Sequence, residues 1–334
     1  MTVTLLESLT HSPPADDLDA RRAALTADIV VPLGHLAHLQ LSGPDAEAFL
    51  QGQLSNDLRE LVPGRSQLSS WNSAKGRVLA LFTGWRENDA IWLETAADII
   101  EPLTRRLKMF VLRSKVAIDT PGVGHPAIGV AGDGVADHLQ ALGLPIPAAV
   151  GDVTAQDGIQ ILRRAGSRAR YSLHGDRARL EPLWQALTAR CRLVGAGSWQ
   201  LLDILAGQPS IITATQDHFV AQMLNLDTLG GISFSKGCYT GQEVIARLHY
   251  LGQLKRRMFL LYAKDAGATA PGSPIHLAQG DQQAVGEVVT VQAHPQRGQA
   301  LLAVLQLAHT QSGELRIGSA DGAPVNELVA LVPD

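Results

Sequence analysis

Residues 236–243 bring a thiol, an ammonium group and two glycines together in one short segment. Thr240 and Glu243 have the spacing of a capping box, in which each side chain accepts a hydrogen bond from the other residue's backbone amide. A helix is therefore predicted to begin directly after Thr240. Cys238 would lie two residues before the N-cap, near the positive end of the helix dipole, with Lys236 on the same loop. Both neighbours favour thiolate over thiol, so we predict a reactive cysteine at position 238.

The residues around this thiol also predict the shape of the loop. Tyr239 and Val244 have the positions of a hydrophobic staple, which would set the angle at which the chain enters the helix. Gly237 and Gly241 leave room for a ligand to approach the backbone. The alternative for such a cysteine is a small buried hydrophobe. That interpretation suits the second cysteine, Cys191, which ends an amphipathic helix and is predicted to be a packing residue.

Length and composition limit the class of protein around these residues. A chain of 334 residues predicts two domains or slightly more. The net charge of −4 and the pI of about 6.3 argue against a surface built for nucleic acid. Two cysteines cannot form a disulfide framework, a four-cysteine zinc cage or an iron–sulfur nest. We therefore expect no metal bound by the protein's own ligands.

The first 14 residues carry no Lys or Arg, so they resemble neither a secretory signal nor an Arg-rich transit peptide. Pro13, Pro14 and the acidic residues Asp16, Asp17 and Asp19 are typical of a loose leader. No window reaches eighteen uninterrupted apolar residues. These features predict a cytoplasmic protein with no membrane partner.

Hydrophobic periodicity in the first third of the chain predicts an α+β unit with an antiparallel sheet. Strands are predicted at 35–42, 67–72, 77–84, 90–95 and 115–119, and helices over 46–58 and 99–111. Residues 73–76 join the second and third strands as a hairpin, with Gly76 at the position that needs a positive φ. His35 and His38 would point to opposite faces of their strand, which argues against a metal pair.

The pattern restarts after the Pro- and Gly-rich residues 121–126. Strands at 127–131, 158–163 and 169–174 alternate with helices at 134–142 and 177–191, and a further helix is predicted at 197–207. Six short strand-like runs at 258–263, 273–277, 285–291, 299–305, 314–317 and 325–331 predict a small antiparallel β-barrel. The predicted domains are 1–120, 121–196, a signature segment at 197–253 that packs back on the first unit, and 254–334.

Several blocks of the chain resemble the YgfZ-type folate-binding proteins, the bacterial relatives of a mitochondrial iron–sulfur assembly factor. The strongest block is 236–247, continued by Tyr250-x-Gly252-x-x-Lys255-Arg256. Weaker blocks lie at 49–53, 75–77 and 219–226. They follow the expected order over most of the chain. One mild departure is Ser55 or Asn56, where the family commonly has Thr.

The resemblance implies a fold shared with the aminomethyltransferase of the glycine cleavage system. In that fold, α+β units and a C-terminal barrel surround a central channel that holds tetrahydrofolate or a derivative. It also implies a folate-dependent role in the maturation or repair of iron–sulfur clusters in client enzymes, with tRNA modification among the processes served. The chain would then be an accessory factor with no direct nucleic-acid binding, using a functional cysteine that matches Cys238.

The same resemblance supplies candidates for ligand contact. Four fall in the strongest block: Lys236, Gln242, Glu243 and Arg247. Seven match the weaker blocks: Gln51, Gln53, Asn72, Lys75, Arg77, Gln222 and Asn225.

Two other functions stay open at the level of sequence. A folate-dependent aminomethyltransferase would place an acidic residue just after a Gly-Gly hairpin, to steer proton and charge during one-carbon transfer. In the matching segment, 75–81, Leu79 and Ala80 occupy the acidic positions. The other alternative is a module that binds folate or a client protein without chemistry of its own.

Overall fold

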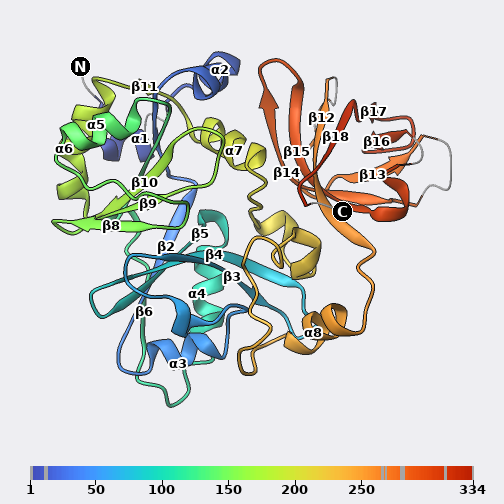
Figure 1. The fold of residues 1–334 in the computed structure, drawn as a ribbon, viewed down its shortest axis with the longest axis horizontal. Helices are drawn as coiled ribbons and strands as arrows, with labels where there is room; N and C mark the ends of the chain where they lie inside the picture. Colours follow the sequence, from blue (N-terminus) through green and yellow to red (C-terminus); the bar gives the residue numbers. More distant parts are fainter. Residues whose placement is uncertain are drawn as a thin grey trace. The chain divides into compact units, whose positions relative to one another are not determined.

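The computed structural model describes residues 3–10, 14–264, 267, 269–278, 283–311 and 314–332. The chain divides into two compact units (Figure 1). The first comprises Met1–Gln51, Asp57–Gln67 and Phe82–Leu202, and the second comprises Gly52–Asn56, Leu68–Leu81 and Asp203–Asp334. The two strands of the predicted hairpin, β3 (Ser66–Asn72) and β4 (Val78–Glu87), each begin in one unit and end in the other.

A six-stranded sheet in the first unit has the order β11-β1-β7-β10-β9-β8. Its strands are β1 (Ile29–Pro32), β7 (Ala127–Ala131), β8 (Val153–Gln156), β9 (Ile159–Arg163), β10 (Arg170–Gly175) and β11 (Arg192–Leu193). Only β1 and β11 pair in parallel among these described strands. Every residue of β7 and β10 is buried, as expected for central strands covered on both faces.

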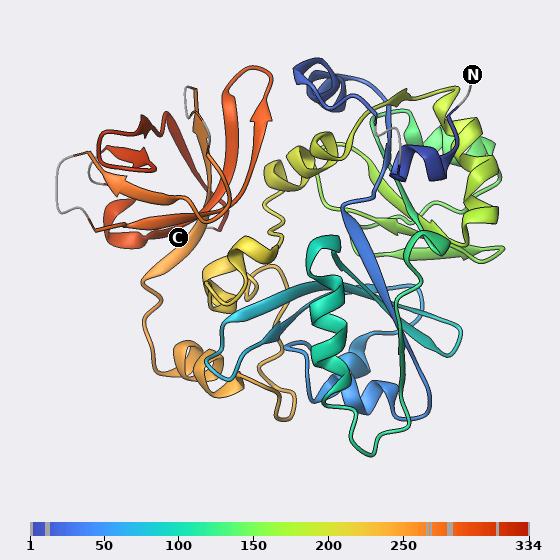
Figure 2. The same cartoon turned by 180° about the vertical axis from the view of Figure 1, so that it is seen from behind.

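Helices supply that cover (Figure 2). The helices α1 (Leu5–Thr10), α5 (Val135–Ala141) and α6 (Arg177–Thr188) share one apolar core with the sheet. The helix α2 (Leu18–Thr26) and the start of α7 (Ala196–Leu205) share another.

The antiparallel five-stranded sheet has the order β3-β4-β5-β2-β6, with β2 (Leu36–Ser42), β5 (Ala90–Ala96) and β6 (Ala117–Asp119). The helices α3 (Ala46–Gln51) and α4 (Ile100–Lys108) follow β2 and β5 in the chain. β2 and β5 pair so that His38 lies directly opposite Glu94. Because alternate residues of a strand face opposite sides, this register places both side chains on one face of the sheet.

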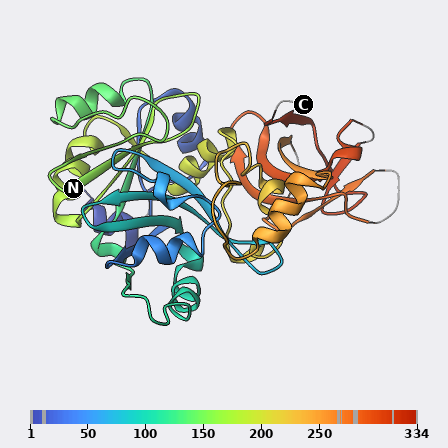
Figure 3. The same ribbon diagram turned by 60° about the horizontal axis from the view of Figure 1, so that its bottom comes forward.

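The C-terminal strands form a curved antiparallel half-barrel of order β17-β16-β13-β14-β15-β12-β18 (Figure 3). They are β12 (Arg256–Ala263), β13 (Pro274–Leu277), β14 (Gly286–His294), β15 (Gly298–Gln306), β16 (Leu315–Ile317), β17 (Ala323–Pro324) and β18 (Glu327–Ala330). Buried aliphatic side chains from β12, β14 and β15 fill its interior. The α+β class and the antiparallel C-terminal sheet are therefore confirmed. Before the half-barrel this unit contains the 3₁₀ turns η4 (Thr213–Thr215) and η5 (Ala221–Leu224) and the helix α8 (Gln242–Tyr250).

Two local predictions were wrong. The acidic leader is ordered where it is described, because Asp17 caps α2 by accepting from the amides of Asp19 and Ala20. Pro13 lies outside the described residues. The helix predicted over 46–58 ends at Gln51, because the chain then pairs with β3 through Leu54 and Trp71.

No helix in the described ranges is both long and apolar enough to cross a membrane. The division into four domains stays a prediction.

Candidate functional site

The helix α8 begins one residue later than predicted, and the capping box is wrong. Its N-cap is Gly241, at φ 83° and ψ 0°, and no side-chain capping bond forms there within the described part of the chain. A Cβ at Gly241 would lie 2.5 Å from the carbonyl oxygen of Ser73 and 3.1 Å from the Cβ of Asn72. The loop therefore presses against the end of β3 so closely that only glycine fits, and the left-handed residue moves Thr240 outside the helix.

The same shift removes the predicted staple, which requires Thr240 as the N-cap. Tyr239 is buried, and burial raises the pKa of its hydroxyl to about 12. Val244 is exposed and lies over Gly76, whose φ of 69° matches the predicted positive φ in the hairpin. The tip of the 73–76 hairpin and the first turn of α8 therefore pack together.

Lys236 ties the signature loop to residues 52–56. Its buried ammonium group donates to the carbonyl oxygens of Leu54 and Asn56, at 2.7 Å each, and lies 5.2 Å from the centre of the Tyr239 ring. A buried ammonium group needs such acceptors, because an unpaired charge away from water is costly. The structure thus gives Lys236 a positioning role in the loop that carries Cys238.

The two cysteines occupy opposite environments. Cys238 is exposed on the loop before α8, whereas Cys191 is buried in the core between α6 and the six-stranded sheet. Burial raises the pKa of the Cys191 thiol to about 11. The prediction that Cys191 is a packing residue is confirmed.

Two candidate amides next to α8, those of Asn72 and Gln222, each have one polar atom without a hydrogen-bond partner among the described residues, and we call them the reserved amides. Asn72 accepts from the hydroxyl of Ser70, and Gln222 donates to the carbonyl oxygen of Ile245 at 2.7 Å. The remaining atoms, Asn72 Nδ2 and Gln222 Oε1, are buried and have no hydrogen-bond partner among the described residues. Gln53 Oε1 is also buried without a hydrogen-bond partner among the described residues. Buried polar atoms are normally paired, so these three require an explanation.

Other candidates are occupied by bonds within the fold. Gln51 donates to Asp57 and accepts from the amide of Leu58. Asn225 donates to the carbonyl oxygen of Met258 and accepts from Arg257. Arg77 donates to two carbonyl oxygens in the segment before η5.

The remaining candidates lie toward solvent. Lys75, Glu243 and Arg247 are exposed, and Gln242 is partly buried, with a long 3.5 Å contact to the carbonyl oxygen of Lys236. All the candidates except Gln51 belong to the second unit, so the fold gathers the signature octet with the blocks at 72–77 and 222–225.

Sequence reasoning missed a polar cluster in the first unit. His38, Glu94 and His174 are buried, and one ligand atom from each lies within 4.8 Å of the others. The rejection of a His35 and His38 pair considered only one strand. The available signal was that the strands predicted at 35–42 and 90–95 could pair, which brings Glu94 opposite His38.

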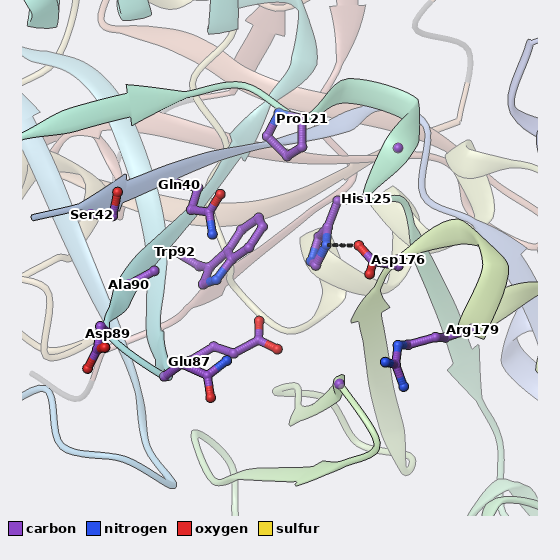
Figure 4. Close-up of a pocket in the computed structure, with 13 residues that line it drawn as sticks. Gln40, Ser42, Glu87, Asp89, Ala90, Trp92, Pro121, His125, Asp176 and Arg179 are labelled. Carbon is purple, nitrogen blue, oxygen red and sulfur yellow. Dashed lines mark ion pairs between the residues drawn. The ribbon is translucent and has the colours of Figure 1, made fainter.

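A cavity of about 640 Å³ lies beside this cluster (Figure 4). Trp92 and His125 project into it, with their rings stacked 4.0 Å apart. Burial and, to a lesser degree, His38 lower the pKa of His125 to about 4. The cavity is lined by Gln40, Ser42, Glu87, Asn88, Asp89, Ala90, Trp92, Pro121, Gly124, His125, Gly158, Asp176 and Arg179.

Comparison with known proteins shows clear sequence similarity to one family. The sequence is 30% identical to the tRNA-modifying protein YgfZ of Shigella sonnei, over 82% of this chain and 83% of that protein. It is 32% identical to the tRNA-modifying protein YgfZ of Edwardsiella ictaluri, over 84% of this chain and 85% of that one. The chain matches no protein-family model.

The fold is similar to that of the glycine cleavage system aminomethyltransferase T from Bartonella henselae. The TM-score is 0.73, over 94% of this chain and 87% of the other, at 14% identity. The predicted aminomethyltransferase-like fold is therefore confirmed, and at this identity the likeness concerns the fold alone.

Proposed function

This chain belongs to the YgfZ family, and we propose that it binds tetrahydrofolate and supports the maturation or repair of iron–sulfur clusters in client enzymes. The thiol of Cys238 is the group through which it acts. The relatives are called tRNA-modifying proteins, so we expect the clients to include an enzyme that modifies tRNA.

The observation that carries the folate assignment is the pair of reserved amide atoms beside α8. Asn72 offers a buried donor, and Gln222 offers a buried acceptor. A buried polar atom left without a partner costs about 1–3 kcal/mol, which a suitable ligand would recover. The pterin edge of a folate carries N–H donors and a carbonyl acceptor, so it fits both atoms.

The position of Cys238 supports its assignment as the acting thiol. It is exposed and stands three residues before the N-cap of α8. Asn72 lies against Gly241 and Gln222 bonds to Ile245, so both reserved amides touch the N-terminal half of the same helix. A bound folate and the thiol would then share one helix end, where a client could reach the thiol from solvent.

An accessory role is favoured over aminomethyl transfer by the interior of β4. Leu79 and Ala80 are buried where the transferase would need a carboxylate. Apolar side chains can neither accept a proton nor stabilise developing positive charge.

Titration calorimetry with tetrahydrofolate tests the ligand. Asn72→Leu replaces the amide with an apolar group of nearly the same shape, so we expect affinity to fall about 3–10-fold through loss of one hydrogen bond. The matched control is Asn326→Leu, an exposed residue of the half-barrel segment whose side chain accepts from the amide of Lys264.

Wild-type affinity in the control and weaker binding in Asn72→Leu would support the assignment. No heat from the wild-type protein at millimolar ligand would overturn it. Ready one-carbon transfer from an aminomethyl donor would favour the transferase instead.

A further inference from the structure

Three strands of the first unit direct a nitrogen, a nitrogen and an oxygen toward one point. His38 is on β2, Glu94 is its cross-strand partner on β5, and His174 is on β10 of the six-stranded sheet. His38 Nε2 lies 3.1 Å from His174 Nδ1 and 3.7 Å from Glu94 Oε2. Two nitrogens bound to one zinc ion at about 2.1 Å are about 3.0–3.4 Å apart for ordinary coordination angles, so the histidine spacing suits shared ligation.

Hydrogen bonds to neighbouring side chains hold the His174 imidazole and the Glu94 carboxylate in place. His174 Nε2 lies 2.8 Å from Ser172 Oγ, and Glu94 Oε1 accepts from Arg164 at 2.6 Å. Arg164 also donates to Ser172 Oγ at 2.7 Å, which joins the two supports. Outer hydrogen bonds of this kind orient metal ligands and select the histidine tautomer.

One carboxylate oxygen in the cluster is unsatisfied. Glu94 Oε2 is buried and has no hydrogen-bond partner within the described residues, although His38 Nε2 and His174 Nε2 each lie 3.7 Å away. A buried carboxylate oxygen that lies beyond hydrogen-bond reach of two imidazoles lacks the partner that buried polar atoms normally have. An ion between the three groups would supply it.

Charge agrees with this arrangement. The Arg164 guanidinium pairs with the Glu94 carboxyl at 2.6 Å. Arg164 also balances that charge, so a divalent ion would retain positive charge and favour an anionic ligand, such as hydroxide, in the position that three protein ligands leave open.

We propose that His38, Glu94 and His174 form a binding site for a divalent first-row transition metal ion, with zinc the best match to two imidazoles and one carboxylate. The site is independent of the folate assignment, since all three residues belong to the first unit. It departs from the expectation that the protein binds no metal through its own ligands. The other interpretation, a metal-free hydrogen-bonded network, is an outcome of the test below.

The test uses the full chain without a histidine tag. Metal content is measured as purified, and the protein is then stripped with a chelator and titrated with Co²⁺. We expect one equivalent to bind and to give the intense visible absorption of a four- or five-coordinate site, with displacement by Zn²⁺.

His174→Gln should weaken Co²⁺ binding by about 100-fold or more, since even changes in outer-shell partners cost 10–100-fold. The matched control is His138→Gln, because His138 pairs with Asp28 at 3.2 Å in the same unit and belongs to no three-ligand group among the described residues. X-ray absorption of the zinc-loaded wild type should show two imidazoles, which decides the matter even if the variant fails to fold. Less than a tenth of an equivalent bound by the wild type would overturn the proposal. So would unchanged binding in a folded His174→Gln, or absorption without imidazole ligands.

Discussion

The signature loop of the second unit and the imidazole–carboxylate cluster of the first (His38, Glu94 and His174) place chemically active groups in opposite ways. The loop presents one exposed thiol and is held by bonds from Lys236 to backbone carbonyls. The cluster is fully buried and is held by side chains that bond to one another. One arrangement leaves a group accessible to a partner, and the other encloses its groups away from water.

This difference governs which region depends on charge and which on shape. In the cluster, removing one charge leaves its partner unpaired in a medium that solvates it poorly. In the loop, the tightest constraint is the approach of Gly241 to Ser73. Substitutions in the two regions should therefore destabilise the protein for different reasons: lost charge pairing in the cluster and steric conflict in the loop.

The largest effect is expected from Glu94→Gln, which leaves Arg164 without its buried carboxylate. Removing one partner of a buried ion pair costs about 3–5 kcal/mol, and we expect a loss of that order in urea unfolding. The control is Glu47→Gln, because Glu47 pairs with Arg86 in a more exposed position, where a loss of about 0–1 kcal/mol is expected. Equal losses in the two variants would contradict the contrast between enclosed and accessible charge.

The two thiols should differ almost as much in reactivity. With a pKa of about 11, only about one in 10⁴ molecules of Cys191 is a thiolate at pH 7, and burial further limits its access to reagents. Alkylation followed by peptide mapping should therefore label Cys238 at least about 100-fold faster. Labelling of Cys191 should rise with pH toward 11 and in urea. Comparable rates at pH 7 in the folded protein would contradict the assigned environments.

A smaller effect is expected from Gly241→Ala, which forces a Cβ against the carbonyl of Ser73 at a positive φ. Strain of this kind costs about 1–3 kcal/mol. Gly237→Ala is the matched control on the same loop, since a Cβ there meets no described atom within 4 Å. Chemical unfolding of both variants checks the prediction, and a neutral Gly241→Ala would show that the loop can move away from β3.

The smallest effect on stability is expected from Asn72→Leu. Leucine removes the acceptor of the Ser70 hydroxyl, which can still donate to Ser55. It also removes a buried amide nitrogen that has no partner among the described residues, so the free energy of unfolding should change little. Asn56→Leu is the contrast, because Asn56 donates to the carbonyl oxygens of Leu68 and Gly230, and its loss should cost about 1–3 kcal/mol. A large loss in Asn72→Leu would mean that the amide serves the fold instead of a ligand.

Features formed by residues close together in the chain could be predicted from the sequence. The octet around Cys238 is local, so its helix, its loop and its cysteine could be inferred, and the strand Ala127–Ala131 matches its predicted bounds. The helix start was wrong by one residue, because the close approach of β3 to Gly241 is a tertiary contact. Capping rules consider only neighbours in the chain.

The cluster of His38, Glu94 and His174 could not be inferred, because it also depends on contacts between residues that are distant in the sequence. Its histidines are separated by 136 residues and meet only through the pairing of strands in two sheets. Reserved amides such as Asn72 and Gln222 were named through resemblance. Their lack of partners depends on the whole fold and is not visible in a single sequence.

The central claim, that this protein acts through Cys238, is tested most directly in a cell that lacks its native counterpart. The activities of cluster-dependent enzymes are measured with the wild-type chain, with Cys238→Ser and with Cys191→Ala at matched protein levels. We predict that the wild type and Cys191→Ala restore those activities and that Cys238→Ser does not. Full restoration by Cys238→Ser would contradict the claim.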